Sequence, residues 1–95
     1  MAKILVVDDD PRLCDMLCRR AGKMGHESGF AVSLREARAA LAETDYDVVF
    51  LDVRLPDGNG LDALPKIRET GSNPEVIIIT GEGSAEGAES AIRNG

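Results

Sequence analysis

The sequence predicts an α/β protein built on an open parallel sheet with helices on both faces. Three continuous aliphatic runs, at residues 3–8, 47–52 and 75–80, are typical of strands buried on both faces of such a sheet. A weaker strand is expected at about 27–31, at an edge. Helical patterns lie between these strands, and this alternation favours right-handed crossovers onto a parallel sheet. We therefore expect four βα units in a single domain.

The first helix is expected to begin after Asp10, a suitable N-cap residue, with Pro11 in the first helical position. Gly22 is expected to end it. Its apolar stripe would consist of Leu13, Leu17 and Ala21.

Three further helices are expected at about 34–43, 61–70 and 84–94. Pro65 is compatible with the third helix only if it lies in the first turn, where a missing N–H does little harm. Ser84 is a suitable N-cap for the fourth helix. The apolar face of that helix is short, so we expect it to be the least firmly held of the four.

Charge and hydropathy exclude several classes of function. The 95 residues carry 11 Lys and Arg against 17 Asp and Glu, giving a formal net charge of -6. Binding to the phosphates of nucleic acid or to an anionic membrane needs clustered cations, so neither is expected of this segment. No apolar run approaches the roughly 20 residues that span a bilayer, and no signal peptide is recognisable, so a cytoplasmic location is expected.

Residues that often carry metal or redox chemistry are sparse. Cys14 and Cys18 lie four residues apart on the first expected helix, without the further Cys or His ligands that a zinc site needs. We interpret them as reduced, half-buried helix residues. His26 stands alone in a glycine-flanked turn at residues 25–27 (GHE) and is expected to end a connection rather than to serve as a catalytic acid or base.

The last expected strand, at residues 76–79, raises the question of what covers it. It is strongly apolar and is followed by a single expected helix before the chain ends at Gly95. Parallel sheets protect their edges. We therefore interpret the sequence as a piece of a longer protein, or as a truncated form whose last strand is covered by a partner.

Acidic and hydroxyl side chains follow the expected strands where their carboxyl ends would meet. Asp8, Asp9 and Asp10 follow the first strand, Asp52 ends a central strand and Thr80 ends the last one. Ligands of open α/β sheets bind at this edge. Several carboxylates in one crevice repel one another unless a cation offsets their charge, and a site with oxygen ligands alone favours Mg²⁺ or Mn²⁺.

Asp52 is the best candidate for a nucleophile that attacks phosphorus to give an acyl phosphate. Residues 53–58 cannot begin a helix, so Asp52 has no helix to cap, whereas Asp10 is explained as an N-cap. Thr80 and Gly81 offer a hydroxyl and a backbone N–H that could hold phosphate oxygens at the same edge. Gly58 and Gly60 are expected to shape the loop after Asp52.

With these motifs in place, the whole sequence resembles the receiver domains of two-component response regulators. The motifs that carry the resemblance are residues 6–10 (VVDDD), 51–61 (LDVRLPDGNGL) and 78–81 (IITG). Residues 80–83 (TGEG) and 91–95 (AIRNG) are most similar to receivers of the nitrogen-regulator type of transcription activator. The resemblance implies a flavodoxin-like fold with strand order 2-1-3-4, and a receiver domain over residues 1–95 that lacks the fifth βα unit.

The resemblance also implies a role for each matching residue. Asp52 would be the phosphoacceptor, Asp9 a direct Mg²⁺ ligand and Asp8 a ligand through water. The backbone carbonyl of Arg54 would be a further ligand, and Thr80 the switch hydroxyl. The module would assist its own phosphorylation and dephosphorylation rather than act as an enzyme on other substrates.

The implied partners are a sensor histidine kinase, as phosphoryl donor, and an output domain that regulates transcription. The lysine and the aromatic switch residue of the family would lie beyond Gly95. A homodimer could form through the exposed fourth strand or by swapping.

Two alternatives remain open. A Mg²⁺-dependent phosphatase with an aspartyl nucleophile would need a second acid at position 54, where this chain has Arg54. A receiver-like interaction module that is never phosphorylated would need no metal at all.

Overall fold

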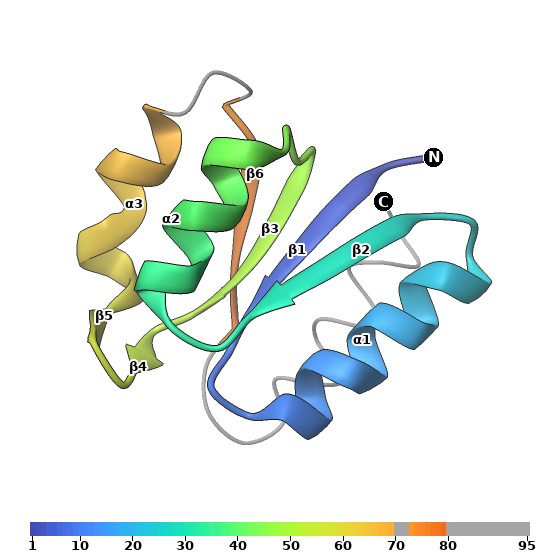
Figure 1. Cartoon of the computed structure of the whole chain (residues 1–95), viewed down its shortest axis with the longest axis horizontal. Helices are drawn as coiled ribbons and strands as arrows, with labels where there is room; N and C mark the ends of the chain where they lie inside the picture. Colours follow the sequence, from blue (N-terminus) through green and yellow to red (C-terminus); the bar gives the residue numbers. More distant parts are fainter. Residues whose placement is uncertain (70–72, 80–95) are drawn as a thin grey trace.

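A computed structural model describes residues 1–69 and 73–79 and contains a four-stranded parallel sheet (Figure 1). The strands are β1 (Lys3–Val7), β2 (Glu27–Ala31), β3 (Val48–Asp52) and β6 (Glu75–Ile79). Their spatial order is β2-β1-β3-β6, which confirms the predicted order 2-1-3-4 because β6 is the fourth parallel strand along the chain. A small antiparallel ribbon of β4 (Arg54–Leu55) and β5 (Gly58–Asn59) follows β3.

Helices cover both faces of the sheet, as predicted. Helix α1 (Pro11–Lys23) lies on one face, while α2 (Leu34–Glu43) and α3 (Gly60–Arg68) lie side by side on the other (Figure 1). Alternate residues of β1 and β3 point into two apolar cores. One core joins the sheet to α2 and α3. The other joins it to α1.

Helix α1 begins as predicted but ends later. The side chain of Asp10 accepts a hydrogen bond from the backbone N–H of Arg12 at 2.9 Å, which confirms Asp10 as the N-cap. The helix continues through Gly22 to Lys23, so the expectation that Gly22 ends it is wrong. Gly25 instead adopts φ +86°, the left-handed conformation that terminates helices, and donates back to the Gly22 carbonyl at 3.0 Å.

Helix α3 also departs from the prediction. The side chain of Asn59 accepts from the backbone N–H of Leu61 at 2.8 Å and fixes the helix start at Gly60. Pro65 is consequently the sixth residue of the helix, so its expected place in the first turn is wrong. Because proline has no backbone N–H, the Leu61 carbonyl lacks the hydrogen-bond donor that a residue four positions later in a helix normally supplies. Pro65 is exposed, so water can solvate this carbonyl and the helix tolerates the missing bond.

The remaining predictions agree with the described residues or lie outside them. Strand β2 is at an edge of the sheet, and α2 has the predicted bounds. Within residues 1–69 and 73–79, β6 pairs only with β3. The expected helix at 84–94 lies outside the described residues. None of the helices described is long and apolar enough to span a bilayer.

Candidate metal site

Strand pairing brings two acidic residues together at the carboxyl edge of the sheet. Strands β1 and β3 are parallel neighbours in which Val7 lies opposite Leu51. The next residue in each strand direction is an aspartate, so Asp8 and Asp52 continue the same register. The sheet therefore places the two carboxylates side by side, as the sequence predicts.

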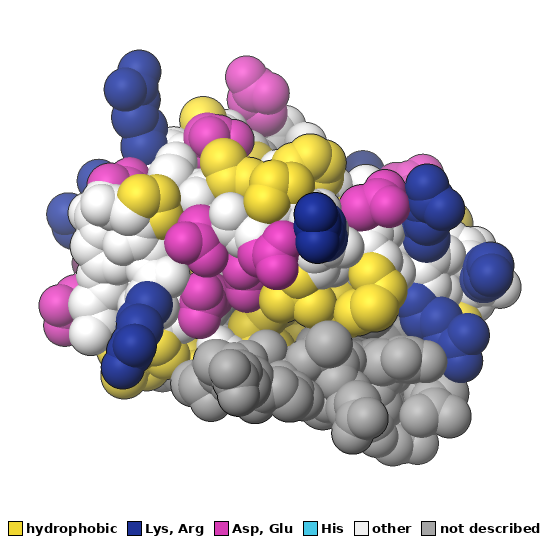
Figure 2. All heavy atoms as spheres, turned by 90° about the horizontal axis from the view of Figure 1, so that it is seen from below, with side chains coloured by type: hydrophobic (Ala, Val, Ile, Leu, Met, Phe, Trp, Pro, Cys, Tyr) yellow, Lys and Arg dark blue, Asp and Glu magenta, His cyan; other side chains and the backbone are white. Residues whose placement is uncertain are grey.

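Asp9 completes a cluster of three carboxylates. One oxygen from each of Asp8, Asp9 and Asp52 lies within 4.8 Å of the other two. Asp8 and Asp52 are only 6% and 9% exposed, whereas Asp9 is exposed. Acidic side chains gather near the centre of the face onto which the strands end (Figure 2). The cluster thus combines two nearly buried carboxylates with one that solvent reaches.

Backbone donors orient the two buried carboxylates. The N–H of Asp10 donates to Oδ1 of Asp8 at 2.9 Å. The N–H of Arg54 donates more weakly to Oδ1 of Asp52, at 3.4 Å. Both of these bonds use Oδ1, so neither engages the second oxygen of its carboxylate.

Helix α1 contacts the backbone of the cluster through Cys14. The thiol of Cys14 is buried and donates to the backbone carbonyl of Asp8 at 3.3 Å. Burial, together with the nearby charge of Asp8, raises the pKa of Cys14 to about 12. Cys14 is therefore a protonated packing residue. Both cysteines are free thiols, as predicted, but only Cys18 is half-buried, whereas Cys14 is fully buried because it faces the core under the sheet.

The two nearly buried carboxylates of the cluster, Asp8 and Asp52, have raised pKa values. Burial raises the pKa of Asp8 above its ordinary value, and the charges of Asp52 and Asp9 raise it further. Burial and the charge of Asp9 likewise raise the pKa of Asp52, against the backbone donor of Arg54. A divalent cation would reverse this penalty, because it attracts all three charges at once.

The donor set fits a hard divalent cation. All the available side-chain ligands are carboxylate oxygens, which suit Mg²⁺ or Mn²⁺ and not zinc. Asp10 is engaged as a helix cap instead. Arg54 lies at the start of β4, directly after the cluster, and the role of its carbonyl stays a prediction. Thr80 and Gly81 lie outside the described residues.

Two residues near the site have contacts that sequence reasoning missed. The carboxylate of Asp57 accepts from the backbone N–H groups of Leu34 and Arg35, and so caps α2 from a distant part of the chain. Gly60 was expected only to shape its loop, but a Cβ there would collide with the backbone oxygen of Asp52. No local sequence pattern predicts the bonds between Asp57 and α2. The close approach of residue 60 to Asp52 could have been inferred from the presence of a glycine there.

Comparisons with known proteins agree with this geometry. Residues 4–95 match the model of the response regulator receiver domain. The chain is 37% identical over 93 residues to the response regulator protein PilR of Pseudomonas aeruginosa, covering 98% of this chain and 21% of that protein. It is 33% identical over 93 residues to the regulatory protein AtoC of Escherichia coli, covering 98% and 20% respectively. Both matches agree with the resemblance to the nitrogen-regulator type.

Similarity to solved structures extends over the same length. A response regulator receiver domain protein from Clostridium thermocellum is 32% identical, with a TM-score of 0.77 and coverage of 100% of this chain and 77% of that one. The chain spans only about a fifth of PilR and of AtoC. With its strand order and its cluster of three aspartates, this chain belongs to the response regulator receiver domain family.

Proposed function

We propose that this domain accepts a phosphoryl group on Asp52, with a divalent cation held by Asp8, Asp9 and Asp52. Phosphorylation-dependent signalling is the function of the family. The observation that carries the proposal for this chain is the approach of the three carboxylates to within 4.8 Å. Asp52 would be the acceptor because it stands alone at the end of β3, an interior strand of the described sheet, whereas β1 is followed by three consecutive aspartates.

The residues have separate tasks in the transfer. A carboxylate oxygen of Asp52 attacks the phosphorus atom and forms a P–O bond, while the bond to the donor breaks and the electron pair leaves with it. The backbone N–H of Arg54 orients the carboxylate that attacks. When bound, Mg²⁺ would neutralise the negative charge of the phosphoryl oxygens. Asp9, the exposed member, would be a direct ligand, and Asp8 a ligand through water.

Three further roles belong to the same proposal. The carbonyl of Arg54 would be an additional metal ligand, which its place two residues after Asp52 supports. Thr80 would be the switch hydroxyl that responds to the phosphoryl group. The backbone N–H of Gly81 would contact phosphoryl oxygens. Thr80 is the first residue after β6 and Gly81 the second, and this sequence position supports both roles.

Labelling with a small acyl phosphate tests the phosphoacceptor. Incubation with radiolabelled acetyl phosphate and Mg²⁺ should give an acid-stable, alkali-labile adduct, and Asp52→Asn should abolish it. Asp10→Asn is the matched control, because asparagine caps helices as well as aspartate does and Asp10 lies beside the cluster without being a member. Equal labelling of the Asp52→Asn variant would show that another residue accepts the phosphoryl group.

Metal binding separates a phosphorylated receiver from a silent interaction module. Titration with Mg²⁺ or Mn²⁺ should show binding that Asp9→Asn weakens at least tenfold, since Asp9 contributes one of three ligands. Binding that does not depend on Asp9 would favour the silent module.

The partners and the context of the domain are also proposals. The phosphoryl donor would be a phosphohistidine of a sensor kinase, and the target an output domain that regulates transcription. Residues 1–95 would supply four βα units of one cytoplasmic receiver domain. Coexpression with candidate kinases, followed by phosphotransfer assays, would identify the donor. A homodimer would form through the fourth parallel strand or by swapping, and sedimentation velocity would show whether the chain dimerises at all.

A further inference from the structure

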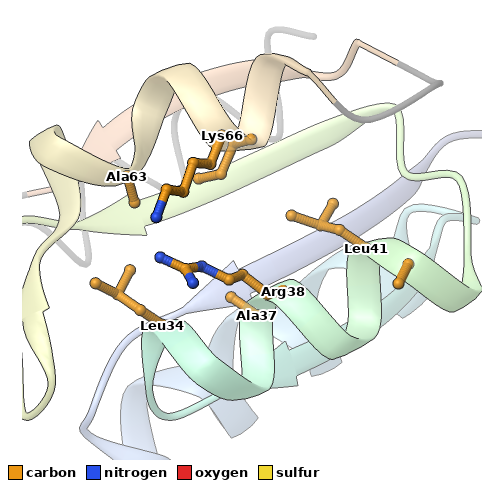
Figure 3. A pocket seen from close by; sticks show the side chains of 8 residues that line it. Leu34, Ala37, Arg38, Leu41, Ala63 and Lys66 are labelled. Carbon is orange, nitrogen blue, oxygen red and sulfur yellow. The ribbon is translucent and has the colours of Figure 1, made fainter.

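A cavity lies between α2 and α3, on the face of the sheet opposite α1. Its volume is about 150 Å³. Helix α2 forms one wall and α3 the other (Figure 3). It is lined by Leu34, Ala37, Arg38, Leu41, Ala42, Ala63, Lys66 and Ile67. None of these residues belongs to the acidic cluster, so the cavity is a separate site.

Small side chains create the cavity. Ala37 and Ala63 project into the space between the helices, where larger residues would close it (Figure 3). Leu34, Leu41 and Ile67 supply the apolar surface around them, and all three are buried in the same core. An apolar cavity of this size holds a small aromatic molecule in other proteins.

Two cations stand at this apolar cavity. Arg38 projects from α2 and Lys66 from α3, and their charged ends point toward each other across the gap (Figure 3). Neither side chain forms an ion pair with any residue in the described ranges. The positive charge of Arg38 contributes to the lowered pKa of Asp57, after the hydrogen bonds from Leu34 and Arg35. Both carboxylate oxygens of Asp57 already accept these bonds from the backbone of α2.

We propose that this cavity binds a small amphiphilic carboxylate, which would place its aliphatic or aromatic body between α2 and α3 and its carboxylate between Arg38 and Lys66. Charge complementarity supports this ligand, because two cations that form no ion pair within residues 1–69 and 73–79 face each other here on a protein of net charge -6. The volume suits one ring or a short acyl chain and excludes a helix of a partner protein. Specificity would follow from combining an apolar pocket with few charged groups.

Octanoate is a suitable probe, with 1-octanol as the uncharged control. Titration of the isotope-labelled chain, followed by NMR, should move the backbone amides of Ala37, Leu41 and Ala63 in a saturable manner. A dissociation constant of about 1 mM is expected, as for a ligand of roughly ten heavy atoms at ordinary efficiency. Octanol should bind at least fivefold more weakly.

Variants separate the contributions of charge and cavity. The double variant Arg38→Gln and Lys66→Gln should weaken octanoate binding about tenfold and leave octanol binding unchanged. A double variant on α1, Arg19→Gln and Lys23→Gln, removes the same charge from the opposite face of the sheet and should bind normally. Ala63→Leu should abolish binding of both probes by filling the cavity.

The test remains decisive if Ala63→Leu fails to fold, because Arg38 and Lys66 are exposed and their replacement leaves the core intact. Equal affinity for octanoate and octanol, or normal octanoate binding by the Arg38→Gln and Lys66→Gln variant, would overturn the proposal. So would the absence of shifts at the cavity amides. Asp9→Asn should leave octanoate binding unchanged, which keeps this result independent of the metal site.

Discussion

Oδ1 of Asp57 accepts a hydrogen bond from the backbone N–H of Leu34 at 2.8 Å, although the two residues are 23 positions apart. The second oxygen accepts from the N–H of Arg35 at 2.9 Å. Asp57 lies between β4 and β5, in the segment that follows Asp52. Its carboxylate therefore connects the segment next to the candidate metal site to the first turn of α2, whose N–H groups and dipole both attract a negative charge.

Replacement of Asp57 should remove these hydrogen bonds to α2 and destabilise the fold. Asp57→Ala removes both acceptors and should lower the midpoint of urea unfolding, whereas Asp57→Asn keeps one acceptor oxygen and should have a smaller effect. Circular dichroism during urea titration measures both. Asp45→Ala, in the turn after α2, is a matched control for loss of one negative charge. An unchanged midpoint in Asp57→Ala would mean that water replaces the carboxylate without cost.

The contribution of Asp57 to the stability of the fold should depend on pH. Its hydrogen bonds to Leu34 and Arg35 lower the pKa of Asp57 below the ordinary value of 3.8. A depressed pKa in the folded state means that the stabilisation is present above about pH 4 and disappears as the pH falls through the lowered value. The difference in unfolding midpoint between wild type and Asp57→Ala should therefore shrink below pH 4. A difference that grew on acidification would contradict this assignment.

Gly60 should tolerate no side chain. A Cβ at this position collides with the backbone oxygen of Asp52, which cannot move without disturbing β3. Gly60→Ala should lower the free energy of unfolding by about 2 kcal/mol, as overpacking does elsewhere, and should weaken Mg²⁺ binding. Gly22→Ala is the control, since a Cβ added at Gly22 would meet no atom within 4 Å. This replacement should raise the free energy of unfolding by about 0.5 kcal/mol. Chemical denaturation distinguishes the two.

Neutralising the acidic cluster should stabilise the metal-free protein. The raised pKa of Asp52 means that the fold loses stability as the pH rises from the ordinary value of 3.8 through the raised folded-state pKa, and this loss is complete at pH 7. At pH 7 in a chelator, Asp52→Asn should gain about 1 kcal/mol, the repulsion of two unit charges roughly 4 Å apart in water. Added Mg²⁺ should stabilise the wild type and leave the variant nearly unchanged. Thermal unfolding with and without Mg²⁺ measures both effects.

Pro65 should be a weak point of α3. Pro65→Ala restores an N–H donor for the Leu61 carbonyl and should stabilise the chain by about 1 kcal/mol, since the gain in the helix exceeds the entropy that proline removes from the unfolded state. Pro74→Ala, outside any helix, should bring no such gain. Equal effects of both replacements would mean that the helix has already adapted to Pro65.

Much of the fold follows from local sequence patterns. The aliphatic runs identify the buried strands, because only strands covered on both faces are continuously apolar. The acidic cluster was predictable for a related reason, since parallel strands must end at one edge and Asp8 and Asp52 are the residues that end them. Asp10 was predictable as a cap from its place before Pro11.

What the sequence left undetermined depends on contacts between distant segments. Two glycines near the end of α1 could each have terminated it, and the choice of Gly25 over Gly22 rests on how the chain turns into β2. The place of Pro65 follows from the cap at Asn59, which competed with other possible starts. The bond from Leu34 to Asp57 joins residues with no periodic relationship, so no helical or strand pattern predicts it.

The segment from residue 53 to residue 59 is held in place by neighbouring elements at both of its ends and at Asp57. It leaves β3 at Asp52, is held to α2 through Asp57, and returns beneath Asp52 at Gly60. Adding or removing one residue within it would break two of these attachments together, whereas exchanging an exposed side chain such as Arg54 would break none. Length is thus a strict requirement on this loop, as are the side chains of Asp57 and Asn59, whereas the exposed side chain of Arg54 forms none of these attachments and is open to variation.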